Sequence, residues 1–175
     1  MYGQYMQLQN SLATLALALD DGVGTTVAER VGTGRSGAAT LASLSVRGPM
    51  SIERLRRILG LSHSTCVRLI QRLEASEWVQ RRAGADRRTV EIELTLSGRR
   101  RAEELFRARA EIVSTVLAPL SPTELAELER LVAKLLGAIT GDRASARHIC
   151  RACDHGACRR NGPCPVDAAA RQHER

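Results

Sequence analysis

The first apolar positions of the chain recur at spacings of three and four residues, which is the period of one face of an α-helix. The residues on this face are Tyr5, Leu8, Leu12, Leu15 and Leu19. Asp20-Asp21-Gly22 is expected to end the helix, and the glycine-rich segment 22–35 is expected to form a short helix or a loop. Residues 36–46 are rich in Ala and Leu and predict another helix, which stops at Gly48-Pro49.

Residues 50–79 contain two shorter amphipathic patterns. Ser51 can cap a first helix and Ser62 a second, and Gly60 lies in the tight turn between them. The apolar positions are Ile52, Leu55, Ile58 and Leu59 in the first helix and Cys66, Leu69, Ile70 and Leu73 in the second. Two short helices joined by a turn that contains glycine are typical of a helix-turn-helix unit.

The apolar period then changes from helical to alternating. The alternating positions are Val90, Glu91, Ile92, Glu93 and Leu94. They predict a half-buried strand, and Trp78 to Arg81 should be its hairpin partner, with a tip at 83–86. A helix-turn-helix followed by a hairpin is a winged helix, so the predicted fold is mainly α with a small β-wing.

Two long helices follow the wing. Ser97 can cap the first, which is expected to run to about Leu117, and Ser121 to Glu124 form a capping box for the second. The second helix carries a Leu-rich stripe over 125–139. One subunit cannot easily bury this stripe together with the stripe at 5–19, because they lie at opposite ends of the chain. We therefore predict a homodimer; the alternative is that the two stripes pack on each other within one subunit.

These patterns divide the chain into four segments. They are N-terminal dimerisation helices at 1–47, a winged helix-turn-helix at 48–98, C-terminal dimerisation helices at 99–141 and a cysteine-rich tail at 142–175. The chain has no apolar run long enough to span a membrane and no signal-peptide pattern at its start, so a cytoplasmic location and no membrane partner are expected. It also has no Ser-His-Asp set, paired carboxylates or phosphate-binding glycine loop, so we expect no enzymatic activity.

Charge and exposed polar residues point to nucleic acid. The 175-residue chain has a net charge of +7 and a pI near 9.9, which favours a polyanionic partner. The outer side of the second short helix and the hairpin supply hydrogen-bonding and cationic groups, namely Ser62, His63, Ser64, Thr65, Arg68, Gln71 and Arg72, then Arg81, Arg82, Arg87 and Arg88. Arginine can bind guanine O6 and N7 together in the major groove. The alternative for the helix is an ordinary solvated face.

At these residues the chain resembles the MarR family of transcriptional regulators. The resemblance rests on L-S-x-S-T-x-x-R-L in the second short helix, on the D-x-R of Asp86 and Arg88, and on the L-T-x-x-G of Leu94 to Gly98. It implies an obligate homodimer whose terminal helices interlock, a recognition helix in the major groove of operator DNA and a wing in the minor groove. It further implies that Asp86 orients Arg88, and that a small molecule or oxidation regulates binding.

The tail holds four of the five cysteines, Cys150, Cys153, Cys158 and Cys164, with intervals of two, four and five residues. Four thiols at such spacing suit a tetrahedral zinc site, similar to a zinc knuckle, or an iron–sulfur cluster. A zinc site is our first interpretation. The alternatives are an iron–sulfur or thiol-based redox sensor, a knuckle that binds single-stranded nucleic acid or protein, a disulfide clasp, and four unconnected thiols. His148 and His155 are expected to be solvated, and Cys66 is expected to be a small core residue.

Together these patterns predict a sequence-specific regulator that binds double-stranded operator DNA, represses transcription and carries Zn²⁺ in its tail.

Overall fold

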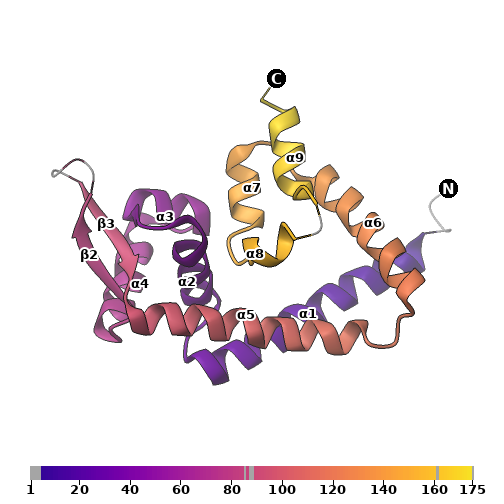
Figure 1. The fold of residues 1–175 in the computed structure, drawn as a ribbon, viewed down its shortest axis with the longest axis horizontal. Coiled ribbons are helices and arrows are strands. Elements are labelled where there is room, and N and C mark those ends of the chain that lie inside the picture. Colours follow the sequence, from indigo (N-terminus) through magenta and orange to yellow (C-terminus); the bar gives the residue numbers. More distant parts are fainter. Residues whose placement is uncertain (1–4, 85, 87–88, 161, 175) are drawn as a thin grey trace.

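The computed structural model describes residues 5–84, 86, 89–160 and 162–174. Its elements are α1 (Met6–Val31), α2 (Arg35–Arg47), β1 (Met50–Ser51), α3 (Ile52–Leu59), α4 (His63–Ala75), β2 (Val79–Ala83), β3 (Val90–Leu94), α5 (Leu96–Leu117), α6 (Pro122–Ile139), α7 (Arg143–Ile149), α8 (His155–Cys158) and α9 (Pro165–Gln172). One small antiparallel sheet with strand order β1-β3-β2 lies at one end of the molecule, beside α3 and α4 (Figure 1). The predicted class, mainly α with a small β-wing, is confirmed.

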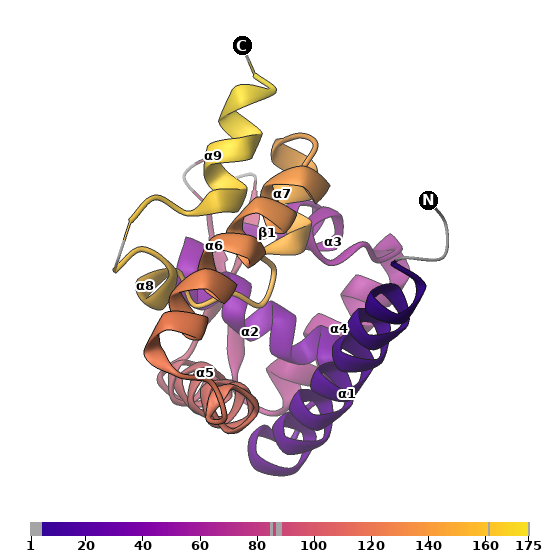
Figure 2. The same ribbon diagram turned by 90° about the vertical axis from the view of Figure 1, so that its right-hand side faces the viewer.

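Helix α1 is longer than the sequence suggested. The expected end at Asp20-Asp21-Gly22 is wrong, because the helix continues to Val31 and ends at Gly32 in the left-handed conformation. Both aspartates form ion pairs with Arg35, so they stabilise the helix start of α2 rather than a turn. Helix α1 packs against α5, and Figure 2 shows α1 running obliquely past α5, which is seen end-on. Packing on α5 outweighs the cost of a glycine in a helix, about 1 kcal/mol.

The helix-turn-helix forms as predicted. Ser51 caps α3 and Ser62 caps α4, while Gly60 turns the chain with a φ of 68°. The predicted inward residues of both helices are buried, except for the half-buried Ile52. Cys66 has no exposed surface, which confirms it as a core residue. Helix α2 lies beneath this unit and is buried from Gly37 to Leu44.

The wing is an antiparallel hairpin of β2 and β3, in which Val79 pairs with Leu94 and Ala83 with Val90. Strand β1 extends the sheet through the pairing of Met50 with Ile92. Ile92 and Leu94 face the core, and Val90 near the tip is exposed. Because apolar and polar residues alternate along β3, one side of the hairpin packs against α2 and α3 and the other side faces solvent.

The start of α5 explains the L-T-x-x-G motif. Thr95, rather than the predicted Ser97, caps α5: its hydroxyl accepts the Gly98 N–H at 3.0 Å and donates to the Glu77 carbonyl at 2.6 Å. A Cβ at position 98 would lie 1.9 Å from the Trp78 carbonyl oxygen. Only glycine allows the first turn of α5 to approach β2 this closely.

The C-terminal region is more structured than a knuckle of turns. The capping box of Ser121 and Glu124 starts α6 as predicted, and α6 contacts α9. The tail forms α7, α8 and α9 around a small core of Ala146, Val166 and Ala170, against which Leu136 packs. Among the described residues, none of the helices combines the length and the apolar character that membrane crossing requires.

Candidate nucleic-acid interface and cysteine site

Helix α4 presents a polar face on the outside of the winged helix. His63, Ser64, Arg68 and Arg72 are exposed, whereas Thr65 is half-buried. The Ser62 hydroxyl accepts the Thr65 N–H at 3.2 Å, so this serine serves the helix end. The side chains of Arg68 and Arg72 form no hydrogen bond or ion pair with any residue that the structure describes. Two cations on this face are therefore available to an anionic partner.

The wing arginines behave differently from one another. Arg81 pairs with Glu74 at 3.0 Å, and Arg82 pairs with Glu91 at 3.2 Å and Glu93 at 3.4 Å. Carboxylates on α4 and β3 therefore neutralise these two arginines, which the sequence predicted only as cationic groups of the hairpin. Asp86 is exposed, and its carbonyl accepts the Thr89 N–H at 2.8 Å. Arg87 and Arg88 lie outside the described residues, so their predicted DNA contacts remain predictions.

The two predicted dimerisation stripes are exposed in the single chain. Leu8 and Leu12 of α1 are 63% and 53% exposed, and Leu135 and Ile139 of α6 are 53% and 65% exposed. Helix α6 has no buried residue. Since a leucine side chain stabilises a fold only when it leaves water, these stripes contribute little in an isolated chain.

The four tail cysteines gather at the junction of the short helices. Cys150 follows α7, Cys153 lies in the next turn, Cys158 ends α8 and Cys164 precedes α9. All four are half-buried free thiols. A hydrogen bond with the Cys153 thiol lowers the pKa of Cys150, and the same bond raises the pKa of Cys153. Burial and a hydrogen bond with Cys164 raise the pKa of Cys158. The four thiols therefore lie close enough to shift one another's pKa.

The four thiols are gathered but do not form a finished metal site. Within the described ranges, no three His, Cys, Asp or Glu side chains are grouped closely enough to hold a metal ion. Neutral thiols attract one another only weakly through S–H···S contacts, whereas thiolates on zinc sit about 2.3 Å from one centre. The donor set and its spacing fit zinc or an iron–sulfur cluster, provided that the cysteine side chains rotate toward a common point.

The tail is attached to three helices of the winged-helix body. The His148 ring forms a hydrogen bond with the Ile58 carbonyl of α3 at 2.9 Å, while the residue itself is exposed, as predicted. The Ser43 hydroxyl of α2 donates to the Arg151 carbonyl at 2.8 Å. Arg109 of α5 donates to the Ala152 carbonyl at 2.5 Å. The loop that holds the first two cysteines is therefore bound to α2 and α5.

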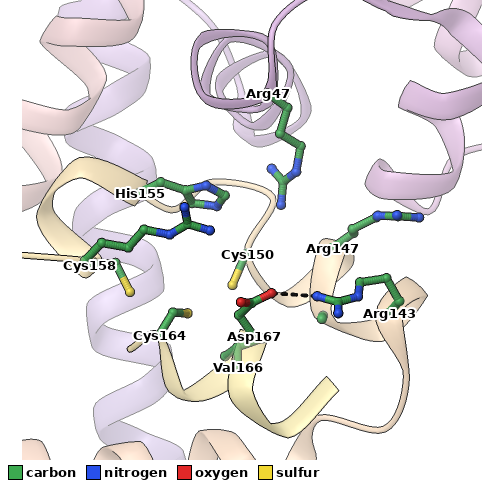
Figure 3. A pocket seen from close by; sticks show the side chains of 11 residues that line it. Arg47, Arg143, Arg147, Cys150, His155, Cys158, Cys164, Val166 and Asp167 are labelled. Atoms are coloured by element: carbon green, nitrogen blue, oxygen red, sulfur yellow. Dashed lines mark hydrogen bonds and ion pairs between the residues drawn. The ribbon is translucent and has the colours of Figure 1, made fainter. Parts of the chain in front are cut away.

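Two cavities adjoin the thiols. The first, of about 310 Å³, is shown in Figure 3 and is lined by three of the cysteines and by Arg47, Arg143, Arg147, His155, Arg159 and Asp167. The predicted solvation of His155 is therefore incomplete: it is half-buried here, and burial lowers its pKa. The second, of about 530 Å³, lies between α1, α2, α5 and the tail and has a mostly apolar lining.

Sequence patterns did not indicate Arg47, Ser43 or Arg109 as partners of the tail. Ser43 and Arg109 contact segments 108 and 43 positions away along the chain. Arg47 precedes Gly48-Pro49, and its position indicates only the end of a helix. No local spacing encodes such contacts, since they depend on how α7 docks on the body.

Comparison with known proteins supports the winged helix. Residues 32–89 match the sequence model of the MarR family. YwoH, an uncharacterised helix-turn-helix transcriptional regulator of Bacillus subtilis, is 36% identical over 67 residues, or 38% of this chain and 49% of YwoH. The chain thus spans about half the length of that curated relative.

Solved structures share the wider fold. RV1404 of Mycobacterium tuberculosis has a TM-score of 0.67 and 24% identity, over 75% of this chain and 91% of its own. A probable transcriptional regulator of Pseudomonas aeruginosa has a TM-score of 0.56 and 27% identity, over 73% and 98%. Proteins of the MarR family are transcription regulators and not enzymes, and the Pseudomonas aeruginosa protein is by its name a probable transcriptional regulator.

Proposed function

We propose that this chain, which carries a MarR-family winged helix over residues 32–89, is a sequence-specific DNA-binding regulator that acts as a homodimer and represses transcription. The observation that carries the proposal is the outer face of α4, where two arginines without partners among the described residues stand beside a hairpin. The side chains of Arg68 and Arg72 form no ion pair with a described residue of the body, whereas cations on such a helix face suit the major groove of DNA.

The position of each residue on α4 suggests its role. The first residues of a recognition helix reach base edges, and later ones meet phosphates. His63, Ser64 and Arg68 therefore face bases, with Arg68 able to bind one guanine through two hydrogen bonds. Arg72, one turn further along, faces the phosphate backbone. Asp86, Arg87 and Arg88 of the wing complete the interface in the adjacent minor groove.

A substitution on α4 tests the interface. Arg68→Ala should weaken binding to a DNA duplex selected by the purified protein by about 1–3 kcal/mol and relax the preference for one base pair. Arg107→Ala is the matched control, because Arg107 is an exposed arginine of α5 that pairs with Glu104. Equal binding by wild type and Arg68→Ala, measured by fluorescence anisotropy, would reject the assignment of α4.

The exposed stripes of α1 and α6 support a homodimer. A dimer would bury both and would place two α4 helices about 34 Å apart, one turn of DNA. Deleting residues 1–19 removes the whole α1 stripe and should give monomeric or insoluble protein that does not retain DNA. A stable truncated monomer that binds DNA like the full chain, seen by sedimentation, would exclude this interface.

A second proposal concerns the tail: Cys150, Cys153, Cys158 and Cys164 bind one Zn²⁺ or, alternatively, an iron–sulfur cluster. Its support is the gathering of the free thiols at one junction, where three of them line a cationic cavity. Elemental analysis of anaerobically purified protein should give one zinc per chain, or iron together with a brown colour. Protein with neither metal would remove this proposal and leave the DNA-binding one in place.

A small-molecule effector would have the apolar cavity between α1, α2 and α5 available to it. That cavity borders residues of α7, α8 and α9 as well as the dimer helix α1. A ligand there would contact both the tail and the body of the regulator.

A further inference from the structure

Arg47 ends α2 and projects into the cavity that contains the thiols. Figure 3 shows its guanidinium directed toward Cys150. Its Nη1 is buried and has no hydrogen-bond partner among the described residues. Burial also lowers the pKa of this guanidinium. A buried N–H group without a protein acceptor loses hydrogen-bond energy, so an acceptor bound in the cavity would restore that hydrogen bond.

The charges around the cavity have the same sign as Arg47. Arg147 and Arg159 also line it, and neither forms a salt bridge with a described residue. Arg143 is the exception, since Asp167 at 2.6 Å and Glu174 at 2.8 Å neutralise it. Among the described residues of the lining, the single carboxylate is Asp167, which is therefore already paired. The unpaired positive charge of the lining therefore favours the binding of a negatively charged group in this cavity.

A metal centre held by the four cysteines is such an occupant. Four neutral thiols carry no charge, but each gives up its proton when its sulfur binds the metal. Four thiolates around one divalent ion then have a net charge of minus two. Sulfur ligands of metal centres accept N–H···S hydrogen bonds, and outer-shell groups of this kind orient the ligands and tune the metal. The buried donor and the surplus positive charge therefore both fit a metal–thiolate centre.

We infer that Arg47 is the outer-shell donor to the four-cysteine metal site, bonding to the Cys150 sulfur and joining the site to α2. This inference rests on the proposal that the tail binds metal. Arg47 is a positioning residue and not a metal ligand. Because it immediately precedes the turn into β1 and α3, the metal centre would be attached to the entry of the helix-turn-helix.

The backbone contacts of the tail give this connection a second route. Cys150 and Cys153 flank Arg151 and Ala152, whose carbonyls accept hydrogen bonds from Ser43 and Arg109. Ligation of the two cysteines would hold this loop in one conformation. Filling the site should therefore hold this loop against α2 and α5, and emptying it should release the loop from both helices.

The test measures metal affinity in full-length variants of position 47. Arg47→Met keeps much of the length of the side chain and removes its charge and donors, whereas Arg47→Lys keeps the charge and loses the planar fork. Arg107→Met is the matched control. Reduced, metal-free protein would be titrated with Co²⁺, whose visible bands report tetrahedral thiolate ligation, and then with Zn²⁺ in competition with a chromophoric chelator.

Wild type and the three variants should each bind one metal ion per chain, and bound Co²⁺ should show the visible bands of tetrahedral thiolate ligation in all of them. Arg47→Met should weaken zinc binding by about 10- to 100-fold, in the range found for outer-shell groups. Arg47→Lys should lose less, and Arg107→Met should match wild type. In wild type, loaded protein should hold selected duplex DNA at least about tenfold more tightly than metal-free protein, and this ratio should shrink in Arg47→Met.

Distinct results would overturn the two proposals separately. Wild-type affinity for zinc in Arg47→Met, with Arg47→Lys unchanged as well, would reject the role of Arg47 and leave the four-cysteine site standing. Failure of wild type to bind cobalt, zinc or reconstituted iron would reject the site itself. Saturable binding of inorganic phosphate that requires Arg47 but not the cysteines would show a simple anion site and also reject the inference. If Arg47→Met does not fold, the zinc affinity of Arg47→Lys decides: a loss supports the role of Arg47, and wild-type affinity rejects it.

Discussion

The winged-helix body and the cysteine tail are built on cores of very different size. Among the described residues, the body buries twenty apolar residues from five helices and three strands in one cluster, whereas the tail buries Ala146, Val166 and Ala170. Two of those three are alanines, which contribute little apolar area. A segment with so small a core needs a metal, a disulfide or a larger neighbour to stay folded.

This difference in core size shows which interactions stabilise each region. The body depends on side chains that leave water, so its stability is distributed over many residues. The tail depends on a few directed contacts: thiols, the ion pairs of Arg143, and three hydrogen bonds to α2, α3 and α5. Losing one contact should therefore be a local event in the tail and a global one in the body.

Metal removal should produce the largest difference between the two regions. Structural zinc contributes about 10 kcal/mol or more to folding near neutral pH. Treatment with a strong chelator should expose the amides of residues 143–172 to hydrogen exchange, while α3 and α4 keep their protection. The same treatment of a Cys66→Ser variant serves as control, because Cys66 belongs to the body. Simultaneous loss of protection in both regions would show that they form one cooperative unit.

A substitution in the body should give the next largest effect. Leu55 has no exposed surface, and Leu55→Ala should lower the free energy of unfolding of the body by about 2–5 kcal/mol. Urea denaturation followed by circular dichroism measures this loss. It should be equal with metal and with chelator, and a loss that depends on the metal would contradict the independence of the two cores.

Val166→Ala is the corresponding substitution in the tail. Val166 is 3% exposed, and removing two methyl groups should cost about 1–3 kcal/mol. Because the tail folds with its metal, the cost should appear as weaker zinc affinity, with tenfold corresponding to about 1.4 kcal/mol. The urea midpoint of the body should stay at its wild-type value. A lowered midpoint would mean that the tail core supports the body.

Among these substitutions, Ser43→Ala should have the smallest effect on stability, and it should act where α2 of the body contacts the tail. Ser43 is fully buried in α2, and its hydroxyl donates to the Arg151 carbonyl. The loss of this bond should cost about 1 kcal/mol and raise the exchange rate of amides in residues 148–153. Thr40→Ala in the same helix is the control, since Thr40 bonds to the Ser36 carbonyl within α2. Equal exchange in both variants would exclude Ser43 as a link to the tail.

Local patterns predicted the body well. Capping serines, the turn glycine and the alternation of β3 each act over a few residues, and they specified α3, α4 and the wing. The pattern failed at Gly22, where packing against α5 carries α1 through a sequence that favours a turn. It also failed at Thr95, whose hydroxyl serves both α5 and the Glu77 carbonyl.

Sequence patterns predicted only some of the residues of the two candidate sites. Spacing singled out Arg68, Arg72 and the four cysteines because the relevant chemistry repeats over short intervals. It could not reveal that Glu74 and Glu91 neutralise two wing arginines, or that Arg47 faces the thiols. Those facts depend on contacts between distant elements, for which a single sequence carries no periodic signal.

The tail meets Ser43 and Arg109 through main-chain oxygens and not through side chains. Any amino acid at positions 151 and 152 presents the same carbonyls, so these two positions are free to diverge among related proteins or in a designed library. An insertion or deletion between Cys150 and Cys153 would instead shift both acceptors out of register. In related proteins, we therefore expect positions 151 and 152 to vary in residue type, while the number of residues between Cys150 and Cys153 stays the same.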